Sequence, residues 1–157
     1  MAREGLSRGD LLLLGAVLSV AGAGISAYLT WEWYAASNST VCDISNYFSC
    51  STVRQSSYSS FLGIPTATVG LAGFVILLAM FVMAFRGRSH LGGSLIDTWI
   101  LLFAVLGGLV GLGLFMIEGF VIQAICLFCL SGFALDLGIL AIAVVLRRRI
   151  TRTRESA

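Results

Sequence analysis

Four long apolar runs, separated by polar segments, constrain the fold of this chain more than any other feature of the sequence. The first run, from Leu11 to Trp31, holds 21 residues without a charge, which is enough for a helix to cross a hydrocarbon core of about 30 Å. A chain inside lipid must satisfy its backbone hydrogen bonds internally, so each run is predicted to be a transmembrane helix. The predicted helices cover about residues 11–31, 65–85, 95–117 and 123–146.

The composition is that of an integral membrane protein. Hydrophobic residues make up 58% of the 157 residues and charged residues 11%, against about a quarter charged in soluble proteins. We therefore predict an all-α bundle of four transmembrane helices in one domain over residues 1–157, with a long loop at 32–64. The basic residues flank apolar runs and are not interleaved with aromatic residues, so the expected surroundings are the lipid bilayer, and no nucleic acid partner is predicted.

The distribution of arginine predicts the orientation in the membrane. Nine of the ten arginines lie in the N-terminal segment, in the connector at residues 86–94 and in the C-terminal tail, and the chain has no lysine. By the positive-inside rule, both termini and this connector are cytoplasmic. The loop at 32–64 and a tight turn predicted at 118–123 then face the extracytoplasmic side.

The four cysteines form two pairs that this topology brings to the same face of the membrane. Cys42 and Cys50 lie in the long loop, and Cys126 and Cys129 form a Cys-x-x-Cys motif near the start of the last predicted helix. Residues three apart share a face of a helix, so the second pair can close a disulfide and store two electrons. The extracytoplasmic side is oxidising, so disulfides persist there. Four cysteines allow three pairings, and an electron relay would use more than one.

Position along the helix predicts a division of roles between the cysteines. Free N–H groups at a helix start favour a thiolate, so Cys126, which is nearer that start, is the more suitable thiol for exchange with the loop. Cys129 lies about 4.5 Å deeper and is better placed for a membrane-dissolved partner. The polar loop pair is suited to a soluble protein.

Two non-redox interpretations compete with a relay. A metal site with four thiolate ligands is conceivable, but the one histidine, His90, is predicted on the opposite face, and no metal is predicted. A non-enzymatic membrane scaffold stapled by disulfides is the alternative from another functional class.

Three segments resemble the vitamin K epoxide reductase family: CDISNYFSCS at residues 42–51, GIPT at 63–66 with Gly70 soon after, and CLFCLS at 126–131. The resemblance extends from the first predicted helix to the last. It implies four helices around a quinone of the ubiquinone, menaquinone or vitamin K type, with a short interfacial helix around Cys50. It also implies that Cys129 reacts with the quinone, that Cys126 is its disulfide partner, that Cys50 shuttles to Cys126, and that Cys42 exchanges with a thioredoxin-like protein.

The function implied by this resemblance is that of a quinone-dependent thiol–disulfide oxidoreductase, which supports disulfide formation in exported proteins. The implied location of the enzyme is a prokaryotic cell membrane. No thioredoxin-like domain follows the last helix, so a separate thioredoxin-like partner is expected. A vitamin K quinone or epoxide reductase is the alternative. Vertebrate members carry tyrosine where this chain has Phe133 and asparagine at the position matched here to Thr66, and both differences are compatible with quinone reduction. The candidates for contact with the quinone are Phe133, Thr66, Phe128 and Phe48.

Carboxylates near the cysteines are further candidates. Asp136 lies seven residues after Cys129, and ionisable groups within a membrane helix are functional candidates by default. It is either a proton or hydrogen-bond partner below the quinone, or a neutral carboxyl bonded to a hydroxyl such as that of Ser19 or Ser26. Asp43 and Glu118, predicted at the outer face, are candidates for proton uptake or are simply solvated.

Overall fold

A computed structural model of the protein describes residues 6–35, 43–45, 47–61, 63–88, 90–91 and 94–155. The elements in chain order are helix α1 (Arg8–Ala35), helix α2 (Cys50–Gln55), strands β1 (Ser60–Phe61) and β2 (Ile64–Pro65), helix α3 (Thr66–Phe85), strands β3 (His90–Leu91) and β4 (Ser94–Leu95), helix α4 (Ile96–Ile117), the π-helical turn η1 (Glu118–Ile122) and helix α5 (Leu127–Glu155).

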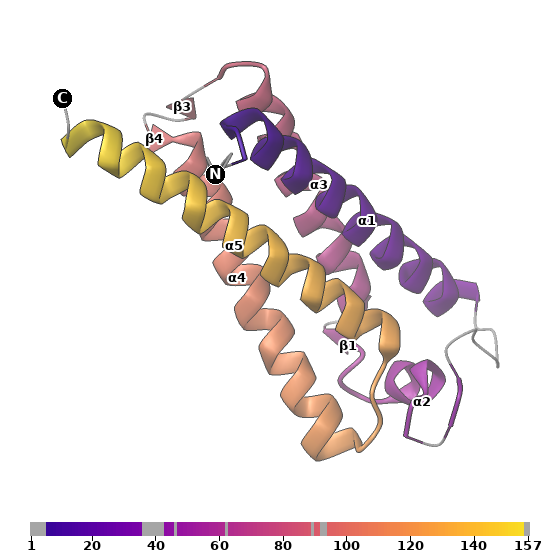
Figure 1. Ribbon diagram of the computed structural model, residues 1–157. Coiled ribbons are helices and arrows are strands. Elements are labelled where there is room, and N and C mark those ends of the chain that lie inside the picture. The colour runs from indigo at the N-terminus through magenta and orange to yellow at the C-terminus, as the bar shows by residue number, and fades with distance from the viewer. Residues whose placement is uncertain are drawn as a thin grey trace.

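Four helices of the described chain are long and apolar enough to cross a membrane: α1, α3, α4 with η1, and α5. Each of α1 and α4 packs against both α3 and α5, so the four helices form a closed bundle, as predicted. Both chain termini lie at one end of this bundle, and α2 lies at the other (Figure 1). We call these the arginine end, which carries Arg8, Arg86 and Arg147, and the cysteine end, which carries Cys50 and Cys126.

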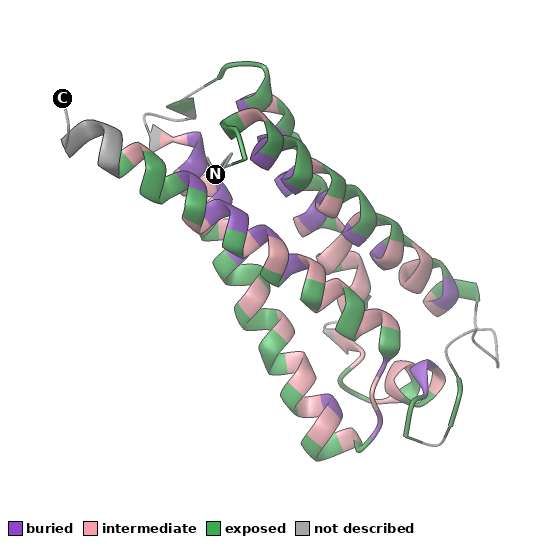
Figure 2. Cartoon of the chain, viewed as in Figure 1, coloured by how far each residue is buried: buried purple, intermediate pink, exposed green. Residues whose placement is uncertain are grey.

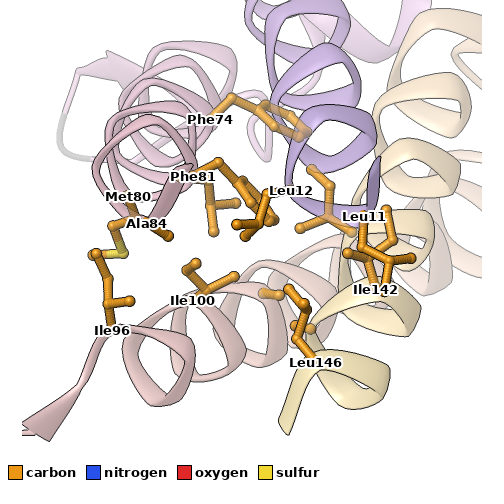
Figure 3. Close-up of a cluster of buried hydrophobic side chains, with 14 residues drawn as sticks. Leu11, Leu12, Phe74, Met80, Phe81, Ala84, Ile96, Ile100, Ile142 and Leu146 are labelled. Atoms are coloured by element: carbon orange, nitrogen blue, oxygen red, sulfur yellow. The ribbon is translucent and has the colours of Figure 1, made fainter. Parts of the chain in front are cut away.

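The hydrophobic core lies in the half of the bundle nearer the arginine end. Figure 2 shows buried residues along the helix faces that meet inside the bundle and exposed residues on the outward faces. Many of these outward residues are apolar, such as Val17 and Leu109, as expected of a surface covered by lipid. Side chains of α1, α3, α4 and α5 interlock in the core (Figure 3); those labelled are Leu11, Leu12, Phe74, Met80, Phe81, Ala84, Ile96, Ile100, Ile142 and Leu146.

Close packing of α1 on α3 depends on two glycines. A Cβ atom at Gly15 would overlap the ring of Phe81, and one at Gly22 would overlap the ring of Phe74. Each aromatic ring therefore fills a recess that only glycine leaves open. This is the small-residue contact by which membrane helices approach one another, since apolar burial alone gives little attraction in lipid.

Helix α1 begins three residues earlier than predicted and ends four residues later, at Ala35. Ser7 and Asp10 cap its start reciprocally: the Asp10 N–H donates to Ser7 Oγ (3.2 Å), and the Ser7 N–H donates to Asp10 Oδ2 (2.9 Å). This capping pair brings the charged residues Arg8 and Asp10 into the helix, so the helix starts before its apolar run.

The predicted tight turn at 118–123 and the predicted start of the last helix at 123 are wrong. Helix α4 continues into η1, and the reversal follows at Gln123, which has a left-handed backbone (φ 56°). Helix α5 then starts at Leu127 and runs through the arginine-rich segment to Glu155, beyond the predicted end at 146. Arginine favours helix, so the positive charges do not end it.

The long loop returns to the bundle through a short helix and a hairpin. Strands β1 and β2 pair antiparallel next to Gly63, whose positive φ of 80° suits glycine. Pro65 is the cap residue of α3, so this helix begins one residue after the predicted start at 65. A second hairpin, β3–β4, lies in the connector at the arginine end.

Candidate active site

The loop reaches the Cys-x-x-Cys motif through a short backbone pairing. Phe48 forms a parallel bridge with Ile125, and the Ile125 N–H donates to the carbonyl of Tyr47 (2.8 Å). The bridge fixes the residue before Cys126 against the segment that leads into α2. Residues far apart in the sequence are thereby held side by side at the cysteine end.

Polar side chains fix the start of α2, and therefore Cys50. Ser49 is the N-cap, and its Oγ accepts the Thr52 N–H (3.2 Å). Asp43 Oδ1 accepts both the Ser49 hydroxyl (2.9 Å) and the Ser51 N–H (3.0 Å). A carboxylate at a helix start satisfies free N–H groups and complements the helix dipole. Asp43, a sequence candidate for proton uptake, thus holds α2 in place, and its proton role stays a prediction.

Cys50 and Cys126 form the centre of the site. Both side chains are buried, at 3% and 2% exposed, and their sulfur atoms are 3.1 Å apart. Cys50 is disulfide-bonded, whereas Cys126 and Cys129 are free thiols. Disulfide exchange needs direct contact between an attacking sulfur and a disulfide sulfur, and this pair meets that requirement. Cys42 lies outside the described residues.

Cys126 lies just before helix α5, not inside it. Its carbonyl accepts the Leu130 N–H (2.9 Å) and its Sγ accepts the Cys129 N–H (3.3 Å), the arrangement of a helix N-cap. The sulfur is therefore held by a helix N–H group, at the position where the sequence predicted stabilisation of a thiolate. The same bond keeps the Cys126 side chain close to Cys129.

Glu118 is a buried carboxylate beside the two thiols. Its Oε2 accepts the Cys126 N–H (3.0 Å), and its carboxylate also interacts with the Cys129 side chain. Only 5% of the residue is exposed, so the solvated alternative considered for it is wrong. The sequence gives one signal for this residue, a single carboxyl at the end of a long apolar run before a predicted turn. It does not show the π-helical turn and the left-handed Gln123 that bring the carboxyl to the cysteines.

A cavity of about 70 Å³ borders the thiols. Its walls come from all four long helices, from α2 and from the turn after α2, and they are mainly apolar. The sequence candidate Thr66 lines it. The other residues of its wall are Leu29, Glu32, Trp33, Cys50, Val53, Arg54, Ser56, Tyr58, Ser59, Pro65, Ala67, Leu114, Ile117, Glu118, Ile122, Cys126 and Cys129.

The three phenylalanines named from the sequence do not line this cavity. Phe133 stacks on Phe115 of α4 (ring centroids 6.4 Å apart, planes at 19°). Phe128 contacts Tyr28 edge to face (5.3 Å) and borders a separate open hollow on α1, and Phe48 is exposed. Contact of these residues with a quinone stays a prediction.

Asp136 lies deep in the bundle, packed against Gly107 and Gly108 of α4. The predicted hydrogen bond to Ser19 or Ser26 is absent among the described residues. The Ser19 hydroxyl donates instead to the carbonyl of Gly15 (2.8 Å), and Asp136 Oδ2 is buried without a partner in the part of the chain described. A role of Asp136 in proton transfer stays a prediction.

The fold and site define an integral membrane protein with a buried thiol–disulfide contact at one end of a four-helix bundle. The model of the vitamin K epoxide reductase family matches residues 13–144, which is most of the chain. The chain therefore belongs to the vitamin K epoxide reductase family. At the family level its activity is that of a quinone-linked thiol oxidoreductase or an epoxide reductase.

Proposed function

We propose that this protein oxidises the dithiol of a separate thioredoxin-like protein and passes the electrons to a membrane quinone. The observation that carries the proposal is the 3.1 Å contact between the sulfur atoms of Cys50 and Cys126, with the Cys129 thiol beside them. In a scaffold that disulfides merely stabilise, each cysteine sulfur would be bonded to one partner. A disulfide-bonded Cys50 in contact with a free Cys126 is instead the arrangement from which exchange proceeds.

The proposed relay balances over two exchanges and one redox step. A partner dithiol first reduces the loop disulfide of Cys42 and Cys50. The Cys50 thiolate then attacks Cys126 of a Cys126–Cys129 disulfide and releases the Cys129 thiolate, after which Cys42 attacks Cys50 and frees Cys126. The loop is now oxidised and the inner pair reduced, the state in which Cys50 is bonded and Cys126 and Cys129 are free. The inner pair passes two electrons and two protons to a quinone and closes its disulfide.

The cavity fits a quinone in chemistry but must widen to hold the ring. Its mainly apolar wall with a few polar groups, including Thr66 and Arg54, is typical of sites for flat apolar ligands. Ligand sites usually measure about 300–1,000 Å³, well above the present volume. Helix α2 and the turn after it are parts of the wall that lie outside the four long helices, so we propose that they move to admit the ring.

The same proposal covers the setting of the protein. Residues 1–157 form one membrane domain, and the arginine end faces the cytoplasm because positively charged segments are retained there. The cysteine end then faces an oxidising compartment, where a thioredoxin-like partner can meet the loop. Direct alkylation of intact cells with a membrane-impermeant reagent tests this orientation: a cysteine introduced next to the exposed Tyr34 should react, and one introduced at the exposed Arg86 should not.

Anaerobic reoxidation tests the function. Purified protein is reduced, freed of reductant and mixed with ubiquinone or menaquinone, while quinone absorbance and free thiols are followed together. We expect one quinone to be reduced for every two thiols lost, and no reduction by Cys126→Ser or Cys129→Ser. Thiols that persist in the presence of either quinone would support the scaffold alternative. A parallel reaction with vitamin K epoxide tests the epoxide reductase alternative.

A further inference from the structure

The inner thiol pair has a carboxylate next to it that the relay above does not use. Glu118 is buried at the cysteine end, and its carboxylate touches both members of the pair: Oε2 accepts the Cys126 N–H at 3.0 Å, and the carboxylate interacts with the Cys129 side chain. Among the described residues it forms no ion pair. A buried carboxylate without a counter-ion is costly, so its place beside two redox thiols calls for a chemical role.

The backbone around Glu118 is shaped to bring it to the thiols. Glu118 opens the π-helical turn η1, and its carbonyl accepts the N–H groups of both Gln123 and Ala124 (3.2 Å for Ala124). The left-handed backbone of Gln123, uncommon for a residue other than glycine, then reverses the chain toward Cys126. Single π-helical turns occur often at functional sites, because they redirect one side chain without ending the helix.

The other polar groups of the cavity do not offer the same contact. The wall carries Glu32 from α1, Cys50 and Arg54 from α2, and Tyr58 from the turn after α2. The Glu32 side chain accepts the Tyr28 hydroxyl, and Arg54 Nη1 donates to the Glu32 carbonyl (2.7 Å). Within the described chain, Glu118 is the carboxylate that interacts with a free thiol.

We propose that Glu118 is a catalytic residue that accepts the proton of the Cys129 thiol and delivers it to the quinone oxygen. The proposal rests on the quinone reduction proposed above. In the balanced step, the Cys129 thiol loses its proton to the Glu118 carboxylate, and its sulfur bonds to that of Cys126 as the Cys126 thiol loses the second proton. The two electrons pass to the quinone, which takes up one proton from Glu118 and one from Cys126. The products are a disulfide, a hydroquinone and the original carboxylate.

Glu118→Gln separates this role from a purely structural one. The glutamine side chain keeps an oxygen that can accept the Cys126 N–H, but it cannot take up a proton. The protein is reduced, freed of reductant and mixed rapidly with ubiquinone under anaerobic conditions. The single-turnover rate is measured from pH 6 to about pH 9, which is near the ordinary pKa of a cysteine thiol. We expect a rate about 100-fold below that of the unmodified protein at neutral pH, the loss typical of removing a general base.

The pH profile is the readout that a structural role would not change. Without Glu118, proton loss from Cys129 must go to solvent, so the rate of Glu118→Gln should rise about tenfold per pH unit while that of the unmodified protein changes little. A Glu118→Gln rate within about threefold of the unmodified protein, with the same profile, would overturn the proposal. If Glu118→Gln does not fold, Glu118→Asp retains the carboxylate one methylene further back, and we expect an intermediate rate with the original profile.

Two controls separate this proposal from the proposed function. Asp10→Asn makes the same chemical change at an exposed carboxylate at the arginine end and should leave the rate unchanged. Formation of a Cys50–Cys126 disulfide needs no proton transfer to quinone and should be retained in Glu118→Gln. If the unmodified protein does not reduce quinone at all, the proposed function fails and this proposal fails with it. If it does so and Glu118→Gln does so equally fast, only the role of Glu118 is overturned.

Discussion

The two ends of the bundle are built differently. At the arginine end, fourteen buried side chains from all four long helices form one continuous core. At the cysteine end, the buried hydrophobic cluster consists of Cys50 and Cys126 with a few half-buried neighbours such as Leu29 and Val53, next to a cavity. Its buried polar residues include Glu32, Ser49 and Glu118.

The residues that stabilise the fold by packing therefore lie at one end of the bundle, and the cysteines lie at the other. Dense packing at the arginine end fixes how the helices cross, so the cysteine end does not need a dense core of its own. A loosely packed end can then hold a cavity that widens and a helix, α2, that presents a sulfur to its partner. Regions with few buried apolar contacts open at lower free energy, as sites that move must. Substitutions at the two ends should therefore affect different measurements.

The largest effect is expected at the cysteine end, for Cys129→Ala. Turnover with dithiothreitol should be abolished, because Cys126 alone cannot close the inner disulfide. A disulfide between Cys50 and Cys126, residues 76 positions apart, should accumulate, because Cys126 can attack the bonded Cys50 and the Cys129 thiol that would displace Cys50 is absent. Non-reducing gels show the trapped form as a mobility shift, and the unfolding temperature should stay close to that of the unmodified protein. Cys126→Ala is the control and should trap nothing with Cys50. Capture of Cys42 in the trapped bond would reverse the proposed order of the relay.

At the arginine end, Phe81→Ala should produce the opposite result. The ring is fully buried and fills the recess left by Gly15, so its removal should lower the free energy of unfolding by about 3–5 kcal/mol. Unfolding in detergent measures the loss, and turnover per folded molecule at low temperature should change less than twofold. A folded Phe81→Ala protein without turnover would show that the two ends are not separable.

Phe133 lies between the two ends, so its substitution tests whether this part of helix α5 belongs to the packed core or to the cysteine site. Its ring stacks on Phe115 and fits against Gly111, so Phe133→Ala should lower the free energy of unfolding by about 2 kcal/mol with little change in the Michaelis constant for quinone. Quinone kinetics and unfolding are measured on the same preparation, and Phe133→Tyr is the conservative control. A roughly tenfold rise in that constant would instead support the quinone contact predicted from the sequence.

The smallest effect concerns the ion pair between Arg8 and Asp97 at the arginine end. Arg8 Nη2 lies 3.0 Å from Asp97 Oδ2, and the two side chains are 44% and 2% exposed. Arg8→Gln leaves a buried carboxylate without its cation, whereas Asp97→Asn leaves an arginine that water can solvate. We expect Arg8→Gln to lower the unfolding free energy by about 1 kcal/mol and Asp97→Asn by less, both with normal turnover. Equal losses would mean that Asp97 has a second partner in the membrane-bound protein.

The sequence by itself determined the class of fold and, at the level of the family, the chemistry. Long uncharged runs can only be helices in lipid, so the four helices and their order followed from composition and length. The spacing of the cysteines and the segments around them led to the family. The Cys-x-x-Cys spacing predicts that Cys126 and Cys129 are a redox pair, because residues three apart meet on one face of a helix. Thr66, for which the resemblance implied contact with a quinone, lines the cavity beside the thiols, and that contact stays a prediction.

Only the tertiary structure decided which groups meet. The contact between Cys50 and Cys126 depends on the bridge between Phe48 and Ile125. The contacts of Glu118 with the Cys126 N–H and the Cys129 thiol depend on a π-helical turn followed by the left-handed Gln123. These contacts arise from hydrogen bonds between segments and from the backbone conformation of one residue, Gln123. Neither of these features leaves a periodic pattern in the sequence. For the same reason the sequence did not show that Cys126 caps helix α5 instead of lying in it, or that Phe133 packs against Gly111 of α4.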